Sequence, residues 1–182
     1  MRLINWTDIL NSKNLPDETR CSAKPYAVPI SVMIDGRQID GRIVADGSPF
    51  GVERVDDGRR YYFFCPGIEA DCGTEPVDTS DFVRSSIYRK FLQYLAIDAQ
   101  GVHQSHFGFP NIYVPFITTS AARQASMMAI LGRITGGSGS KMILFKTFST
   151  FTSYEAPRPP SGHMLTEDWQ RVGHSPFNFL TS

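Results

Sequence analysis

Two Asp-Gly pairs, Asp35-Gly36 and Asp57-Gly58, each lie between two strand-like runs in the first part of the chain. Asp-Gly suits the two-residue turn that joins antiparallel strands, because both turn positions need a positive φ angle. The sequence therefore predicts antiparallel hairpins in the first part of the chain. After them, strand patterns alternate with helix patterns, as in βα crossovers. Together these features predict an α/β fold with a mixed β-sheet flanked by helices, in the order helix, three to four strands, helix, strand, helix, strand.

The expected helices follow apolar residues that recur three and four positions apart. They cover residues 3–12, 80–98 and 121–135. Ser80 or Asp81 is expected to cap the second of these helices. Thr119 or Ser120 is expected to cap the third.

The length of 182 residues predicts one domain spanning residues 1–182. Its tail, from about residue 152 to 182, is expected to be irregular because "APRPPSG" interrupts both helix and strand patterns. Gly101 and the segment "FGFPN" predict a loop between the second helix and the next strand.

Composition limits the classes of protein to which this chain can belong. The formal net charge is zero, so any basic surface for nucleic acid must be local. No apolar run is long enough for a membrane span, and the N-terminus lacks a signal-peptide pattern. Three cysteines without metal-site spacing, Cys21, Cys65 and Cys72, indicate reduced thiols in a cytoplasmic protein. Cys65 lies in an apolar run and is expected to be buried, whereas Cys72 is expected to be accessible.

The stretch "IEADCGTEP" places two acids, Glu69 and Asp71, directly after the most apolar short run, "RRYYFFCPG". Residues two apart in a strand point to the same face, and like charges side by side call for a compensating cation. A third acid, Asp46, ends the run "GRIVAD". Asp46, Glu69 and Asp71 are therefore candidate ligands of Mg²⁺, which takes oxygen ligands. The structural alternative is that Asp46 starts a turn and Glu69 pairs with an arginine.

Basic residues follow the acids. Arg84, Arg89 and Lys90 lie on the next expected helix, where they form either a solvated basic face or a contact to the DNA backbone. His103 and His106 lie three positions apart beside the expected loop. They are candidates to face a phosphate or to cap an element, and zinc binding is not expected there.

Five segments together resemble the replication-relaxation proteins of bacterial plasmids and mobile elements. They are "GRIVADGSPFGVE", "YYFFCPGIEADCGTEPV", "SSIYRKFLQYL", "FGFPNIYVPFITTSAAR" and "TEDWQRVGHSPF", and the resemblance covers roughly residues 40–180. It implies a core of the PD-(D/E)XK, restriction-endonuclease-like type. It also implies a role in plasmid DNA replication or relaxation.

In a fold of that type, an acid follows the second strand and an acid-x-lysine motif ends the third. Asp46 matches the first acid and Glu69 the second, while Ala45 stands where proline is usual. Asp71 stands where the lysine belongs. Lys90, on the next helix, can supply the missing charge because its long stem can pack on apolar surface while its ammonium reaches a polar site.

The resemblance implies Mg²⁺-dependent hydrolysis of a phosphodiester, in which Asp46 and Glu69 hold the ion, Asp71 extends the site and Lys90 stabilises charge. The alternative is a catalytically inactive DNA-binding or protein-interaction module of a plasmid replication complex. The displaced lysine and the zero net charge favour the alternative. In both cases the expected partners are DNA and other replication or DNA-binding proteins, and no membrane is expected.

Overall fold

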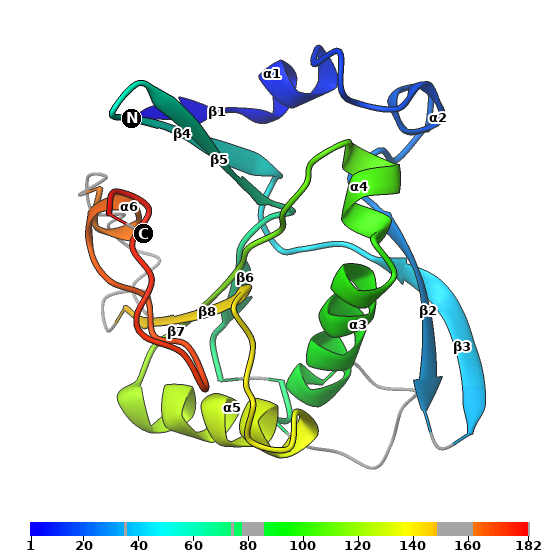
Figure 1. Cartoon of the computed structure of the whole chain (residues 1–182). Coiled ribbons are helices and arrows are strands. Elements are labelled where there is room, and N and C mark those ends of the chain that lie inside the picture. Colours follow the sequence, from blue (N-terminus) through cyan, green and yellow to red (C-terminus); the bar gives the residue numbers. More distant parts are fainter. Residues whose placement is uncertain (35, 74, 78–85, 149–161, 182) are drawn as a thin grey trace, which may run out of the picture.

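Antiparallel strands fill the first third of the chain, and parallel strands alternate with helices after it (Figure 1). The computed structural model describes residues 1–34, 36–73, 75–77, 86–148 and 162–181. Its elements, in chain order, are β1 (Arg2–Ile4), α1 (Trp6–Leu10), α2 (Asp17–Arg20), β2 (Val28–Ile34), β3 (Arg37–Ile43), β4 (Phe50–Asp56), β5 (Arg59–Cys65), β6 (Glu69–Asp71), α3 (Ile87–Ala99), α4 (Val102–Phe107), β7 (Val114–Thr118), α5 (Ala121–Ile134), β8 (Ile143–Thr147) and α6 (His163–Thr166). The predicted mixed α/β class is confirmed.

The Asp57-Gly58 turn joins β4 to β5, as predicted. Asp57 and Gly58 have φ angles of 46° and 76°, the positive values that a two-residue turn of this kind requires. Strands β4 and β5 then pair in antiparallel register along their whole length. Strand β1 pairs with the other edge of β4. The helix that was predicted from residue 3 therefore begins later, at Trp6, behind an Asn5 cap.

The second predicted hairpin, β2–β3, forms a two-stranded sheet of its own. Gly36 at its turn has a φ angle of 75°, while Asp35 lies outside the described residues. Alternate residues of β2 are buried, and β2 packs against α3. The buried residues are Val28, Ile30, Val32 and Ile34.

A proline–glycine pair separates β5 from β6, at the bend that the sequence predicted. Gly67 has a φ angle of 148°, and a Cβ atom there would collide with Ala45 and with the Gly47 carbonyl. The chain that leads from β3 to β4 crosses β6 at this point, where the Gly47 amide donates to the Ile68 carbonyl at 3.0 Å. This close crossing, which only glycine permits, brings Asp46 beside β6.

Strands β6, β7 and β8 form a parallel sheet. The expected single mixed sheet is thus divided, because the named strands belong to one parallel sheet and two antiparallel ones. The bend at Gly67 is the physical reason, since it turns β6 away from the partners of β5. A hydrogen bond of 2.7 Å from the Tyr113 amide to the Phe64 carbonyl still links β5 to the segment before β7.

Helices α3 and α5 begin behind serine caps. The Ser120 side chain accepts a hydrogen bond from the Arg123 amide, which confirms one of the predicted caps. Helix α3 begins at Ile87 behind Ser86, later than the predicted start at residue 80. The predicted caps of this helix fall in residues 78–85, outside the described residues.

Helix α4 occupies part of the segment that was predicted to be a loop, so that prediction is wrong for Val102–Phe107, whereas residues 108–113 form neither helix nor strand. Gly101 and Gly108 bound the helix, and both have left-handed backbones with φ angles of 65° and 74°. The glycines therefore mark the two ends of a short helix, and do not extend a loop.

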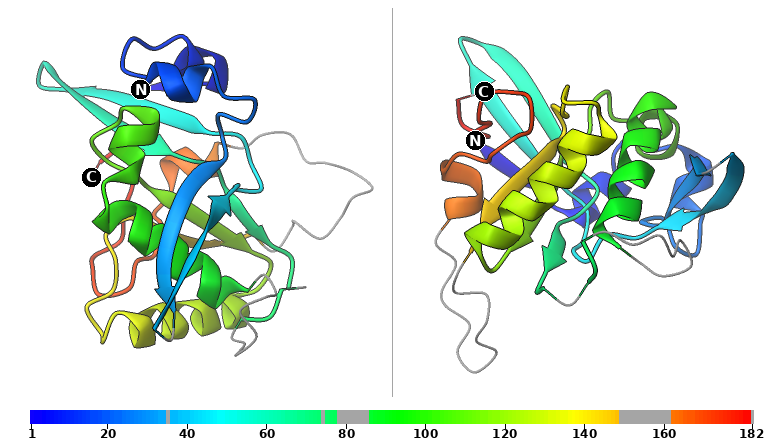
Figure 2. Two further views of the ribbon diagram at one scale, coloured as in Figure 1. Left: turned by 90° about the vertical axis from the view of Figure 1, so that its right-hand side faces the viewer. Right: turned by 90° about the horizontal axis from the view of Figure 1, so that it is seen from below.

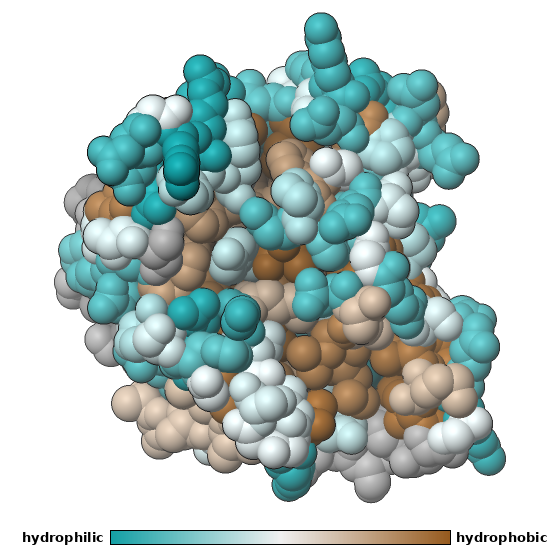
Figure 3. Space-filling model, viewed as in Figure 1, coloured by the Kyte–Doolittle hydropathy of each residue, from teal (hydrophilic) through white to brown (hydrophobic). Residues whose placement is uncertain are grey.

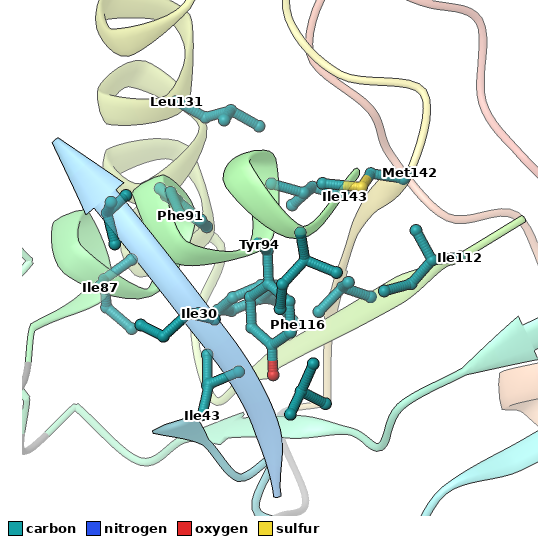
Figure 4. Close-up of a cluster of buried hydrophobic side chains, with 14 of the residues drawn as sticks. Ile30, Ile43, Ile87, Phe91, Tyr94, Ile112, Phe116, Leu131, Met142 and Ile143 are labelled. Atoms are coloured by element: carbon teal, nitrogen blue, oxygen red, sulfur yellow. The ribbon is translucent and has the colours of Figure 1, made fainter. Parts of the chain in front are cut away.

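The parallel sheet is covered on both faces (Figure 2). On one face, Phe116 of β7 packs against Phe91 and Tyr94 of α3, with ring centroids 5.0 Å and 6.1 Å apart (Figure 4). On the other face, the tail of residues 162–181 buries aromatic side chains, each worth about 1.5–3 kcal/mol. These are Trp169, Phe177 and Phe179. The part of the tail that the structure describes is therefore packed, with a short helix and two isolated β-bridges.

The surface of the view in Figure 1 is hydrophilic around the β1–β4–β5 end, while apolar atoms show in the hollow at its centre (Figure 3). No helix within the described ranges has the length and apolar character that crossing a membrane requires.

All three cysteines are free. Cys65 is buried and Cys72 exposed, as predicted, and burial raises the pKa of the Cys65 thiol.

Candidate functional site

Strand β6 places two acids on the face of the parallel sheet that carries α3 and α5. Glu69 pairs in register with Phe116 and Asp71 with Thr118. Both carboxylates are buried, with residue exposures of 1% and 5%. Because buried carboxylates need hydrogen bonds or opposite charges, their partners decide what each acid does.

Glu69 has hydrogen bonds at both carboxylate oxygens. Lys90 of α3 donates from Nζ to Oε2 at 2.8 Å, and the Tyr94 hydroxyl donates to Oε1. Lys90 and Tyr94 lie four residues apart, so they occupy the same face of α3. Burial raises the pKa of Glu69, and the charge of Lys90 with the two hydrogen bonds offsets part of that rise. Burial opposes the charge on Lys90, but the attraction of Glu69 outweighs it and raises the pKa of the ammonium.

Asp46 reaches the same lysine from the crossing segment between β3 and β4. Its Oδ2 atom accepts a hydrogen bond from the Ala70 amide at 2.9 Å and lies 3.7 Å from Lys90 Nζ. The Asp46 side chain is 47% exposed, so this side of the cluster is open to solvent. The structure therefore brings together Asp46, Glu69 and Lys90, which are three of the predicted site residues.

Glu75 is a third acid at Lys90, and sequence reasoning did not single it out. Its Oε2 atom lies 3.2 Å from Lys90 Nζ, and its side chain is 25% exposed. The only sequence signal was its place in the quoted acidic stretch, four residues after Asp71. We call Asp46, Glu69, Glu75 and Lys90 the Lys90 cluster; its three carboxylates and one ammonium carry a formal charge of −2.

Asp71 belongs to a separate ion pair. Arg123, in the first turn of α5, donates from Nε to Oδ2 at 2.6 Å and from Nη2 to Oδ1 at 2.9 Å. Thr118 and the Gly73 amide donate to the same carboxylate. Burial opposes the charge of Asp71, but Arg123 outweighs it and lowers the pKa of the carboxyl. Arg123 also donates to the Glu75 carbonyl, so the pair braces the loop that carries Glu75.

The remaining predicted site residues lie in other surroundings. Arg84 falls outside the described residues, and Arg89 is half-buried on α3. His103 is buried in α4. His106 approaches the Thr19 hydroxyl at 3.2 Å and the Pro25 carbonyl at 2.9 Å. The histidines therefore help to pack the fold, and His106 anchors the segment before β2.

The predicted Mg²⁺ ligands fit the structure only in part. Among the residues that the structure describes, no three His, Cys, Asp or Glu side chains converge as metal ligands. Asp71 does not fit, because Arg123 occupies both of its oxygens. Asp46, Glu69 and Glu75 match Mg²⁺ in donor type only: each presents a carboxylate oxygen to one shared cation, and the cluster keeps excess negative charge. In this structure the shared cation is the ammonium of Lys90.

Fold and site together define a mixed α/β protein with a lysine–carboxylate cluster at the edge of a parallel sheet. Comparisons with known proteins find no matching family model, no matching curated protein and no matching solved structure. The function therefore has to be inferred from the residues of the cluster and the resemblance that the sequence itself suggests.

Proposed function

We propose that this protein acts on the DNA of a plasmid or mobile element and hydrolyses phosphodiester bonds with the help of Mg²⁺. The observation that carries the proposal is the position of Lys90 Nζ, 2.8 Å from Glu69 and 3.7 Å from Asp46. These are the two acids and the relocated lysine that the resemblance to restriction-endonuclease-like proteins implies. They come from three separate segments of the chain.

Each residue has a proposed role. Asp46 and Glu69 would hold the ion, and Glu75 would support them in place of Asp71. The bound ion supplies a water of lowered pKa and positive charge against the phosphodiester. Tyr94 keeps Glu69 in place through its hydrogen bond to Oε1. Lys90 contributes a positive charge for a phosphate oxygen, since an ammonium has three donors and no acceptor.

One experiment tests this function directly. Supercoiled plasmid is incubated with the purified protein and Mg²⁺ or Mn²⁺, and nicking is followed on gels. We expect nicking by the parent and a loss of at least about a hundredfold in Asp46→Asn and Glu69→Gln, because removing a group that stabilises transition-state charge costs about that much. Lys146→Met is the control for disturbing a buried ion pair outside the Lys90 cluster. Like Lys90, Lys146 is an ion-paired lysine with little exposure, but it binds Glu167 at 3.0 Å on the tail side of the sheet.

The second candidate function is a catalytically inactive DNA-binding or protein-interaction module of a replication complex. It is favoured by the hydrogen bonds at both oxygens of Glu69, which leave that carboxylate fully satisfied without an ion. Binding of plasmid DNA without any nicking, with either ion and on supercoiled, branched or single-stranded DNA, would establish this alternative. With either function we propose a cytoplasmic location, which three free cysteines support.

A further inference from the structure

The two faces of the β4–β5 hairpin differ in how their arginines are paired. Side chains that oppose each other across two strands lie on the same face, and neighbours along one strand lie on opposite faces. One face carries Glu53, which lies 3.1 Å from Arg60 and 3.7 Å from Arg2. The other face carries Arg54, directly opposite Tyr61. The protein itself therefore supplies an acid for the arginines of the first face.

Arg54 has no acid of this kind. The residue is 8% exposed, and within the described ranges its Nε and Nη1 atoms are buried without a hydrogen-bond partner. Its guanidinium carbon lies 4.8 Å from the centroid of the Tyr61 ring and 5.7 Å from that of Phe63. A buried charge without an opposite charge or hydrogen bonds is unfavourable. An anion bound by Arg54 would offset that cost.

We infer that this face of the hairpin binds a single strand of DNA, with a phosphate on Arg54 and an unpaired base stacked on Tyr61. We call Arg54, Tyr61 and Phe63 the Arg54 face. The inference rests on the proposed function, because it names the form of DNA that the protein holds, but it requires no metal ion. It assigns DNA contacts to residues that the sequence did not single out.

The chemistry of the Arg54 face fits a single strand. A guanidinium has five N–H donors in a planar fork that matches the oxygens of a phosphate. Tyr61 is 38% exposed, and an aromatic ring can stack on any unpaired base. A duplex keeps the faces of its bases stacked on one another, so only unpaired bases can use this ring. Asp56 and Arg59 oppose each other nearer the turn, so Arg54 leaves this side of the hairpin with a net positive charge.

The hairpin also lies close to the candidate site along the chain. Strand β4 begins four residues after Asp46, and Glu69 follows the end of β5 by four residues. The hairpin extends from the body of the molecule at its β1–β4–β5 end (Figures 1 and 2). Arg54 follows Asp46 by eight residues, so their Cα atoms are at most roughly 29 Å apart. One DNA strand can therefore reach both the Arg54 face and the Lys90 cluster.

The test is fluorescence anisotropy of the full chain with a labelled oligothymidylate, in EDTA and at several salt concentrations. We expect Arg54→Met to bind at least about tenfold more weakly, because it loses a charge-assisted hydrogen bond. The slope of log Kd against log salt should fall by about 0.7, the value for one phosphate contact on a single strand. Tyr61→Leu should bind at least about fivefold more weakly with an unchanged slope, since stacking releases no counterions. Tyr62→Leu, 39% exposed on the opposite face, should stay within about twofold of the parent.

Thermal unfolding and two further variants separate binding from folding. Arg54→Met removes an unpaired buried charge, so its melting temperature should be no lower than the parent's. Arg171 also lies over an aromatic ring, 5.5 Å from the centroid of Phe177, but donates to the Ser175 and Lys141 carbonyls. Arg171→Met should therefore keep the parent's affinity. If Arg54→Met does not fold, Arg54→Lys decides the question: it keeps the charge but loses the planar fork, and parent-like affinity in it overturns the phosphate role.

The outcomes distinguish this inference from the proposed hydrolysis. Parent-like affinity and slope in Arg54→Met overturn the inference and leave the hydrolysis standing. Weaker binding by Arg54→Met, in a protein that never nicks DNA, supports the inference and removes the hydrolysis. Equal losses in Tyr61→Leu and Tyr62→Leu overturn the choice of face. Tighter binding of the parent to a duplex than to oligothymidylate overturns the single-strand assignment, and absence of any DNA binding by the parent overturns both proposals.

Discussion

Tyr94 and Lys90, one helical turn apart on α3, divide the two carboxylate oxygens of Glu69 between them. The hydroxyl of Tyr94 binds the inner oxygen and is fully buried, whereas Lys90 binds the other oxygen next to two partly exposed acids. The Tyr94 hydroxyl therefore anchors the carboxylate from the buried side, and Lys90 links it to Asp46 and Glu75. This division of roles leads to the first prediction.

Tyr94→Phe should lower the free energy of unfolding by about 1.5–3 kcal/mol, because a buried carboxylate loses a charge-assisted hydrogen bond. Chemical denaturation measures the change. Tyr113→Phe is the matched control, since Tyr113 lies on the tail side of the sheet and stacks on Phe177 at 4.7 Å. It should change stability by less than about 0.5 kcal/mol. Equal losses in the two variants would contradict an anchoring role for Tyr94.

Arg123→Met should destabilise the protein by about 3–5 kcal/mol, because it leaves Asp71 buried without its cation. The double variant Asp71→Asn/Arg123→Met should recover part of that loss, which gives a measurable coupling energy between the two sites. Arg37→Met, at an exposed position of β3, should be nearly neutral. Strictly additive losses in the double variant would show that Asp71 and Arg123 do not stabilise each other.

Stability should fall as the pH drops below about 6.5, the ordinary pKa of histidine, and His106 should be one cause. Burial, and to a smaller extent Arg42, lower the pKa of His106 in the folded state, although the Pro25 carbonyl opposes the shift. The unfolded chain therefore takes up the proton first, which favours unfolding as the pH falls through the unfolded value towards the folded one. His106→Gln should lose stability less steeply between pH 7 and pH 5. A parent-like slope in His106→Gln would refute the assignment.

Thiol labelling should distinguish the cysteines. Under native conditions a disulfide reagent should modify Cys21 and Cys72, which are exposed, and spare Cys65, which is buried and has a raised pKa. Mass spectrometry should then find two adducts on the folded chain and three after denaturation. Cys72→Ser should remove one adduct from the native protein. A third native adduct would mean that β5 opens readily.

Local sequence signals predicted much of the fold. The Asp57-Gly58 turn and the Ser120 cap depend on atoms within a few residues, so the local sequence is enough to predict them. The extent of α4 and the start of α3 at Ile87 were missed. Both depend on where neighbouring segments allow a helix to pack, and the propensities of a single segment do not contain that information.

The candidate site was predictable only in outline. Lys90, on the helix that follows β6, was expected to bring its charge to the acids because its long stem can pack on apolar surface while its ammonium reaches a polar site. Glu75 was not expected to join them, because its position depends on a loop that Arg123 holds from a distant helix.

The sequence by itself determined which residue types are present, the turns, one helix cap and the projection of Glu69 and Asp71 to one face of a strand. Tertiary structure decided which cation each acid meets. Asp71 and Arg123 are 52 residues apart, and Glu69 and Lys90 are 21 apart. Buried charges are stable only in pairs with good geometry, and that geometry exists only after α3 and α5 have packed on the parallel sheet.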